Sequence, residues 1–228
     1  MKSLSLIVPA YNAEKFIENS LREYNKIFSE KFNPFEIIVV CNACKDRTTE
    51  KVIALKKELP LKIINTPKAG KGNAIKLGFQ KANQDIVGFL DADNPYNLEE
   101  VIDMISYLES FDMVIVTKFK RALKYQTSIT RRFFSIAGAT VFRLLFGFHF
   151  KDTQAGAKFM NKTLIDKFKK EFICSGFEFD MELLYEASKK RAKIKEYYIK
   201  PNEADFTTVK MRILPGLVYR LLKMRLIK

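Results

Sequence analysis

Two aspartates stand one residue apart at the end of a short apolar run, residues 86–90. A run of this length with turn signals on both sides is typical of a buried parallel strand. Side chains alternate along a strand, so Asp91 and Asp93 point the same way if the chain stays extended. Paired carboxylates at a strand end suit Mg²⁺ or Mn²⁺, typically shared with a phosphorylated ligand. A capped turn is the alternative, because Asp and Asn before a proline favour turns and Asn97 can cap the next helix.

A loop rich in glycine and lysine, residues 68–73, precedes a helical pattern. Its backbone N–H groups can cradle a phosphate, with Lys71 adding charge. The loop departs from G-x-x-x-x-G-K-[ST], which argues against a P-loop ATPase. The single His149 lies in an apolar run, so neither a zinc site nor a Ser/His triad is supported. Cys41 and Cys44 have redox spacing but lack a second cysteine pair, so we expect reduced thiols.

Apolar runs and helical periods alternate along the chain, which predicts an α/β fold with a mainly parallel sheet flanked by helices. Ligands of such sheets bind at the carboxyl ends of the strands, so the segments 11–12, 41–46 and 91–94 are expected to converge. This convergence favours the metal interpretation of the two aspartates. The expected strands are 3–9, 35–40, 61–64, 86–90, 113–117 and 193–199, with 152–158 as strand or loop. The expected helices are 14–28, 46 or 48 to 59, 74–82, 98–110 and 177–190.

The net charge of +14 is concentrated in two segments without acidic residues. Residues 113–151 hold eight Lys and Arg and residues 206–228 hold six, which together equal the whole excess. Such patches indicate an anionic partner such as phosphate, acidic lipid or nucleic acid. The apolar run 133–150 suits a helix lying in a membrane interface, although an ordinary core helix is the alternative. With no spanning segment and no signal peptide visible, we expect a cytoplasmic protein, peripheral on the cytoplasmic face of an anionic membrane.

The order of several motifs resembles that of the family 2 glycosyltransferases of GT-A, Rossmann-like fold. These motifs are Ile7-Val8-Pro9-Ala10-Tyr11-Asn12, Ile37-Ile38-Val39-Val40, Gly70-Lys71-Gly72-Asn73-Ala74 and Leu90-Asp91-Ala92-Asp93. Three later motifs are similar to those of the polyprenyl- or dolichyl-phosphate sugar synthases within that family. They are Arg131-Arg132, Asp152-x-Gln154-x-Gly156-x-Lys158 and Phe179-Asp180-x-Glu182-Leu183. The resemblance covers nearly the whole chain. It implies a GT-A domain over 1–205, with a nucleotide-sugar half at 1–117, an acceptor half at 118–205 and a membrane-association segment at 206–228.

The resemblance also implies roles for particular residues. The nucleotide sugar would contact Pro9, Ala10, Tyr11, Asn12, Asn42, Asp46, Lys71, Gly72, Asp91 and Ala92. Asp91 and Asp93 would hold Mg²⁺ or Mn²⁺, and the catalytic residues would be Asp93, Gln154, Lys158 and Asp180. The acceptor phosphate would bind Lys118, Arg121, Arg131 and Arg132. The family commonly has two aspartates where this chain has Cys41 and Asn42, which cannot accept hydrogen bonds as a carboxylate does, so UDP and GDP both stay open.

The implied activity is inverting transfer of a hexose from a GDP- or UDP-sugar to a polyprenyl or dolichyl phosphate. A phosphate acceptor is already anionic and needs no strong base, which suits a chain without an evident catalytic histidine. A hydroxyl acceptor on a glycan or glycolipid would need a carboxylate base, for which Asp180 or Glu178 are candidates. The chain has no Trp and therefore lacks the Q-x-x-R-W motif of processive polysaccharide synthases. A non-catalytic nucleotide-sugar binder and a nucleic-acid-binding protein are the rival classes, the latter without a recognisable RNA-binding motif.

Overall fold

The computed structural model describes residues 2–117, 150, 152–168 and 172–200 of the chain. Several expectations fall outside these residues. They are the acceptor-phosphate side chains Lys118, Arg121, Arg131 and Arg132, nearly all of the interface helix at 133–150, and the basic segment 206–228. Along the part of the chain that is described, no helix is long and apolar enough to cross a membrane.

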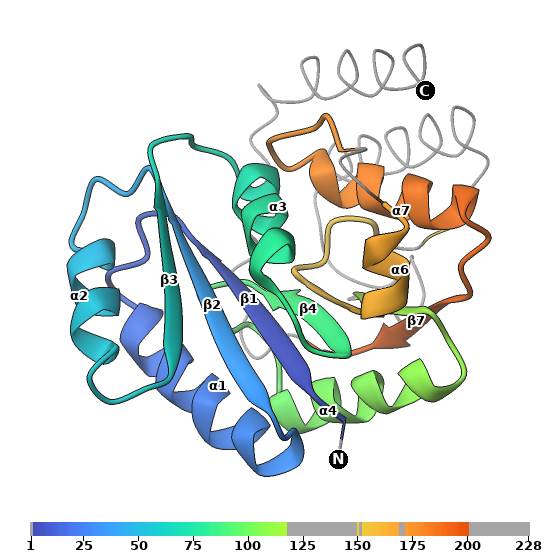
Figure 1. Ribbon diagram of the computed structural model, residues 1–228, viewed down its shortest axis with the longest axis horizontal. Coiled ribbons are helices and arrows are strands. Elements are labelled where there is room, and N and C mark those ends of the chain that lie inside the picture. The colour runs from blue at the N-terminus through green and yellow to red at the C-terminus, as the bar shows by residue number, and fades with distance from the viewer. Residues whose placement is uncertain (1, 118–149, 151, 169–171, 201–228) are drawn as a thin grey trace, which may run out of the picture.

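Seven strands form one sheet in the order β3-β2-β1-β4-β6-β5-β7 (Figure 1). Neighbouring strands are parallel except at β6, which runs antiparallel to both β4 and β5. The strands are β1 (Leu4–Ala10), β2 (Phe35–Asn42), β3 (Leu61–Thr66), β4 (Ile86–Leu90), β5 (Met113–Thr117), β6 (Ala157–Asn161) and β7 (Ile194–Tyr198). The predicted α/β fold with a mainly parallel sheet is therefore confirmed.

The helices lie close to the ranges expected from the sequence, with shifts of a few residues at their ends. They are α1 (Ile17–Lys31), α2 (Thr48–Leu55), α3 (Lys71–Lys81), α4 (Leu98–Ser106), its 3-10 extension η1 (Tyr107–Glu109), α6 (Lys162–Asp166) and α7 (Phe179–Lys189). Helix α6 was not predicted, because five residues are too few to show a helical period. The stretch 152–158 is a loop until Ala157, where β6 begins.

Apolar side chains on both faces of the sheet hold the helices in place. Successive residues of β1 point to opposite faces of the sheet and enter different clusters: Leu6 packs with α1 and α4, whereas Ile7 packs with α3 and α7. The buried side of α1 repeats every three or four residues, which is why the segment forms an amphipathic helix. Its members are Ile17, Leu21, Tyr24 and Phe28. The sheet is thus covered on both faces, as parallel strands require.

The chain reverses its direction of travel across the sheet at β1. From β1 it continues to β2 and β3 on one side, and it returns to β4 on the other side. Loops that leave β1 and β4 therefore diverge, and in open α/β sheets this switch point forms a ligand-binding crevice at the carboxyl ends of the strands. The start of the antiparallel strand β6 lies in the same region, because its first residue, Ala157, pairs with Leu90 at the end of β4.

Candidate active site

The two aspartates lie directly after β4, at the switch point. The chain does not stay extended there and forms the turn given as the alternative: residues 92–93 are a turn in which Asn94 N–H donates to the Asp91 carbonyl over 3.3 Å. Asn94 has a φ of 43°, which asparagine tolerates better than most residues. Asn97 caps α4 as predicted, since its side chain accepts from the N–H groups of Glu99 and Glu100. Asp91 and Ala92 are half-buried and Asp93 is exposed, so the turn faces solvent.

An ammonium group faces the first aspartate. Lys71 begins α3, and its Nζ lies 2.8 Å from Asp91 Oδ1 and 3.7 Å from Asp180 Oδ2 on α7. Burial alone lowers the pKa of Lys71, but the negative charges of Asp180 and Asp91 outweigh it and raise that pKa above its ordinary value. Lys71 therefore carries its charge at any physiological pH.

A second lysine shares Asp180. Lys158 on β6 is fully buried, and its Nζ lies 2.5 Å from Asp180 Oδ1 and donates to the Ala155 carbonyl over 2.7 Å. Burial lowers the pKa of Lys158 below its ordinary value, in spite of the adjacent carboxylate. Both lysine ammonium groups also lie over the Phe89 ring, at 5.5 and 5.4 Å from its centroid, a distance at which cations are attracted to the ring face. The structure thus joins Asp91, Lys71, Asp180 and Lys158 into one charge network, which we call the four-residue network.

The loop before β6 approaches the Asp91 carboxylate so closely that only glycine fits. A Cβ at position 156 would lie 1.6 Å from Asp91 Oδ2. The N–H of Gly156 donates to the Tyr96 hydroxyl over 3.2 Å, which fixes this loop against the segment after β4. Gln154, in the same loop, has a buried Nε2 with no hydrogen-bond partner among the residues that the structure describes. A buried amide without a partner is rare, and this Nε2 could donate to a polar ligand atom.

Asn42 is committed to the protein's own backbone. Its Nδ2 donates to the Ala10 carbonyl over 2.8 Å, and its Oδ1 accepts from Gly70 N–H over 3.0 Å. The side chain is 2% exposed. Each polar atom of the amide thus has a partner within the protein, and the expected contact of Asn42 with the nucleotide stays a prediction. Asn42 ties the end of β1 to the Gly/Lys loop.

Three backbone N–H groups of the Gly/Lys loop also donate to acceptors within the protein. Gly70 donates to Asn42, while Gly72 and Asn73 donate to the carbonyls of Gly176 and Ser175. A Cβ at Gly72 would lie 2.6 Å from that of Phe179, so the loop packs closely on the start of α7. The three N–H groups are therefore not aimed at a phosphate, which corrects the expected backbone cradle. The Lys71 ammonium remains as the loop's contribution of positive charge.

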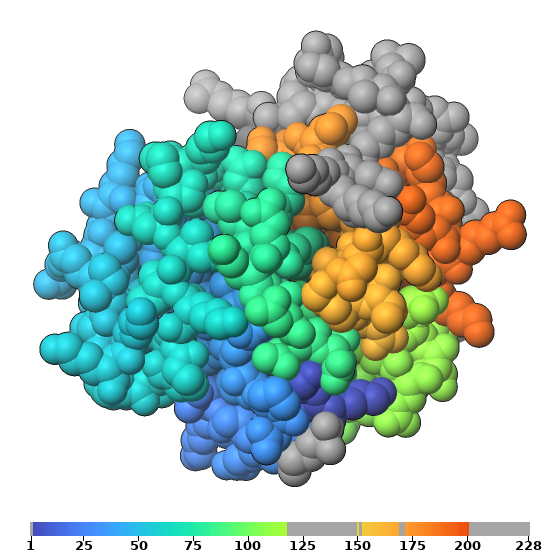
Figure 2. Space-filling view, in the orientation of Figure 1, coloured from blue at the N-terminus to red at the C-terminus, as the bar shows by residue number. Residues whose placement is uncertain are grey.

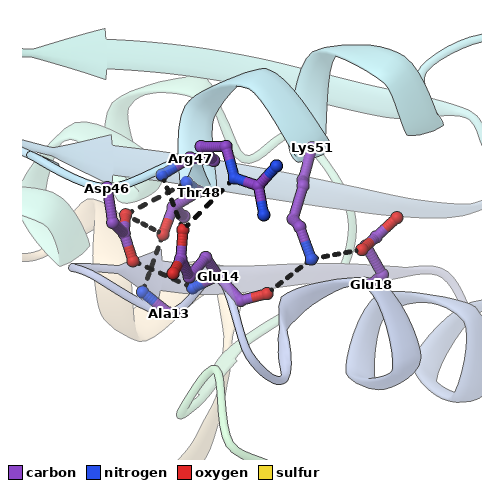
Figure 3. Close-up of polar contacts among 7 residues, drawn as sticks. All are labelled: Ala13, Glu14, Glu18, Asp46, Arg47, Thr48 and Lys51. Atoms are coloured by element: carbon purple, nitrogen blue, oxygen red, sulfur yellow. Dashed lines mark hydrogen bonds and ion pairs between the residues drawn. The ribbon is translucent and has the colours of Figure 1, made fainter.

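A polar cluster fixes the loop after β1 against α2 (Figure 3). Asp46 Oδ2 accepts from Glu14 N–H, and its Oδ1 accepts from both the N–H and the hydroxyl of Thr48. The Thr48 hydroxyl in turn accepts from Ala13 N–H over 2.7 Å. Desolvation raises the pKa of Asp46, but these hydrogen bonds outweigh it and hold the pKa below its ordinary value. Asp46 therefore positions the loop, and its expected contact with the nucleotide stays a prediction.

The remaining predicted donor-site residues surround this loop. Pro9 and Ala10 end β1, and Tyr11 after them is 54% exposed. Asn12 has a φ of 48°, and its Oδ1 accepts from Lys45 N–H over 2.8 Å. An exposed tyrosine beside a crevice is available to stack on a planar group.

Two cysteines lie at the end of β2 and just after it, Cys41 and Cys44, and neither forms a disulfide bond with another described cysteine. Cys41 is fully buried, and this burial raises its pKa to about 11. Cys44 is half-buried and lines a pocket of about 520 Å³ together with Asn65 and Thr66 at the end of β3. A larger groove of about 870 Å³ is lined by residues of α3 together with Ile165 and Phe172. Figure 2 shows the side of the molecule on which α3 and α6 lie next to each other. None of the predicted site residues lines that groove, so size alone does not locate the site.

The donor set fits a divalent metal that is shared with a ligand. Among the described residues, no three or more His, Cys, Asp or Glu side chains cluster closely enough to hold a metal by themselves. Asp91 and Asp93 are hard oxygen donors on a solvent-facing turn, and Mg²⁺ is commonly held by one or two carboxylates plus substrate phosphates. The two aspartates therefore suit a metal whose remaining ligands come from a diphosphate and water.

Two residues to which the sequence assigned no role hold the site from behind. Tyr24, fully buried on α1, donates its hydroxyl to the Asp91 carbonyl over 2.7 Å. Burial raises the pKa of Tyr24 well above its ordinary value, so the phenol stays protonated as the donor. Glu182, also buried, accepts from the N–H groups of Ile173 and Cys174. Tyr24 fits the apolar period of α1, so only its hydroxyl, a polar group at a core position, could have signalled this role.

Comparison with known proteins places these observations in context. The sequence model described as "Glycosyl transferase family 2" matches residues 5–169. The chain is 30% identical over 226 residues to a dolichyl-phosphate beta-glucosyltransferase of Trichomonas vaginalis, covering 91% of this chain and 68% of that protein. It is 28% identical to the dolichyl-phosphate beta-glucosyltransferase of Saccharomyces cerevisiae, covering 92% and 70%.

Solved structures share the fold at lower identity. The glucosyl-3-phosphoglycerate synthase of Mycobacterium tuberculosis in complex with UDP superposes with a TM-score of 0.73 at 17% identity, covering 99% of this chain and 79% of that one. Another structure of that synthase contains Mn²⁺, UDP and glucosyl-3-phosphoglycerate. At this level of identity the likeness shows a common fold.

Proposed function

Since this chain belongs to glycosyltransferase family 2, we propose that it transfers glucose from UDP-glucose to a polyprenyl or dolichyl phosphate. The names of the relatives from Trichomonas and yeast support the sugar, the β linkage and the lipid phosphate acceptor. A β product from an α-linked donor means inversion at the anomeric carbon. The UDP complex of a protein with the same fold supports uridine as the base of the donor.

One observation carries the choice of a phosphate acceptor. Both carboxylates that could serve as base for a hydroxyl acceptor are buried and engaged. Asp180 is held between Lys158 and Lys71, and Glu178 accepts from Gly176 N–H. Each oxygen of the Asp180 carboxylate already faces a lysine ammonium group, so Asp180 is poorly placed to reach and accept the proton of an incoming hydroxyl. A phosphate monoester attacks as an anion and needs no base, so this site suits it better than a sugar hydroxyl.

On the donor side, the diphosphate of UDP-glucose would lie against Lys71 and the turn at Asp91 and Asp93. Lys71 would offset the charge that develops on the departing UDP, where preorganised cations act most strongly. A divalent metal held by Asp91 and Asp93 would add Lewis-acid stabilisation of the same leaving group. The unpartnered Nε2 of Gln154 would donate to an oxygen of the glucosyl group or its phosphate. Lys158 keeps Gln154 in place through the adjacent Ala155 carbonyl.

The acceptor would reach the site from an anionic membrane surface. The eight Lys and Arg within 113–151 and the six within 206–228 support this route, because each adds about 1 kcal/mol of attraction near an acidic leaflet. A polyprenyl phosphate offers both a negative head group and an apolar chain to such segments. We therefore propose peripheral binding at the membrane face that carries the lipid phosphate.

The test is transfer of labelled glucose from UDP-glucose into an organic-soluble product on vesicles that contain a polyprenyl phosphate. We expect product with Mg²⁺ or Mn²⁺, loss of product with EDTA, and little product from GDP-linked donors. The variant Asp93→Asn should abolish transfer without changing the thermal unfolding temperature, since Asp93 is exposed. Binding of UDP-glucose without transfer to any lipid phosphate would overturn the proposal in favour of a non-catalytic binder.

A further inference from the structure

The structure places an ammonium group where a cation would otherwise approach the Asp91 carboxylate. Lys71 Nζ lies 2.8 Å from Asp91 Oδ1, while Asp93 beside it is exposed to water. We propose that Lys71 makes the Asp91–Asp93 turn a poor site for a free divalent cation and a good site only when a nucleoside diphosphate binds with it. This inference rests on the proposed function, because it concerns the order in which donor and metal assemble.

The donor set alone is weak. Asp91 and Asp93 are two carboxylates, and no third acidic, cysteine or histidine ligand joins them among the residues described by the structure. One of the two is already neutralised by Lys71. A divalent ion that arrives alone therefore meets one carboxylate that is already paired, and the Lys71 ammonium at contact distance with that carboxylate repels the ion.

The lysine cannot swing away as a surface lysine does. Its side chain is only 11% exposed, its ammonium lies over the Phe89 ring at 5.5 Å, and Asp180 Oδ2 is 3.7 Å away. Asp180 is held in turn by Lys158, so the second partner of Lys71 is itself fixed. The positive charge is thus built into the site and not supplied by a mobile side chain.

A diphosphate reverses the balance of charge. UDP brings about three negative charges near neutral pH, and the diphosphate of a UDP-sugar brings about two; these attract both the metal and Lys71. The metal can then take Asp91, because Lys71 has two other acceptors within reach, the diphosphate and Asp180 Oδ2. Binding of metal and of nucleotide should therefore be positively coupled, and by linkage each must strengthen the other by the same factor.

The experiment measures Mn²⁺ binding by electron paramagnetic resonance, with and without UDP, on full-length protein. For the wild type we expect weak binding of Mn²⁺ alone and binding at least about tenfold tighter with UDP. For Lys71→Met we expect Mn²⁺ alone to bind about tenfold more tightly than in the wild type, as removal of a unit charge beside a divalent ion implies. Lys76→Met, which removes a lysine farther along α3, should behave as the wild type.

Two results overturn the inference while leaving the proposed function intact. One is a wild type that binds Mn²⁺ equally well with and without UDP, a measurement that needs no variant to fold. The other is a folded Lys71→Met protein whose affinity for Mn²⁺ alone is unchanged or weaker. If the wild type binds no Mn²⁺ even with UDP, the metal part of the proposed function fails as well. Thermal unfolding of each variant checks that the comparison is made on folded protein.

Discussion

Gly156 sets the distance between the loop before β6 and the Asp91 carboxylate, so Gly156→Ala should displace that carboxylate. The added Cβ would lie 1.6 Å from Asp91 Oδ2 and 2.3 Å from Asp91 Cγ. Ordinary contact begins near 3.4 Å, so Oδ2 must move by 3.4 minus 1.6, or about 1.8 Å. The side chain of Asp91 is 34% exposed and can rotate toward solvent, which is easier than moving the backbone of β4.

The displacement should damage transfer far more than stability. Rotation of Asp91 breaks its pair with Lys71, and a partly exposed pair of this kind contributes about 1 kcal/mol or less to folding. By contrast, misplacing a group at a reacting centre by about 1 Å can cost about 10²-fold in rate. We therefore expect kcat/KM for UDP-glucose to fall about a hundredfold or more, with a decrease of a few degrees in Tm.

The assay is glucose transfer to polyprenyl phosphate, run beside thermal unfolding. Gly78→Ala provides the contrast, because its Cβ would meet Ile7 Cγ2 at 2.5 Å in the core under α3. That variant should lose about 1–3 kcal/mol of stability through overpacking and keep its kcat/KM per folded molecule. Retention of more than half of the wild-type kcat/KM by folded Gly156→Ala would refute the reasoning, because the position of Asp91 would then not matter for transfer.

Two further substitutions and one labelling experiment test the groups around the site. Lys158→Met breaks a buried ion pair, so we expect a loss of about 3–5 kcal/mol in urea unfolding, which a loss near zero would contradict. Asn42→Asp removes the donor to the Ala10 carbonyl, so it should cost about 1–3 kcal/mol and give no gain in UDP affinity by calorimetry. In the folded protein at pH 8, iodoacetamide should modify Cys44 before Cys41, whose buried thiol has a pKa raised to about 11; mass spectrometry of peptides reads the order.

The fold could be predicted from the sequence because its signals are local. Strands such as residues 86–90 are short apolar runs, and the period of residues 14–28 indicates a helix without reference to the rest of the chain. The capping role of Asn97 is also local, and it is confirmed. The turn at residues 92–93 was one of two alternatives that the sequence left open, because the alternation argument holds only while the backbone stays extended.

The partners of individual site residues could not be predicted, because they depend on which distant segments meet. Asn42 was expected to face the nucleotide, but the position of β1 and of the Gly/Lys loop gives both its amide atoms backbone partners. The N–H groups of Gly72 and Asn73 in that loop likewise donate to residues 175–176, about a hundred positions away in sequence. The sequence identified the residues that gather at the strand ends, whereas packing decided which of them keep free polar groups.

The four-residue network shows why function, more than stability, accounts for the buried charges. Lys158 and Asp180 are fully desolvated, and a buried ion pair is often no more stabilising than well-packed apolar side chains of similar volume. If stability alone mattered, apolar side chains could fill the space between β6 and α7 without the free-energy cost of desolvating two charges. An apolar pair, however, could not place a carboxylate oxygen, here Asp180 Oδ2, 3.7 Å from Lys71 Nζ. Asp180 thereby helps to keep a positive charge at the Asp91 turn, and under the proposed function this charge would stabilise the departing diphosphate.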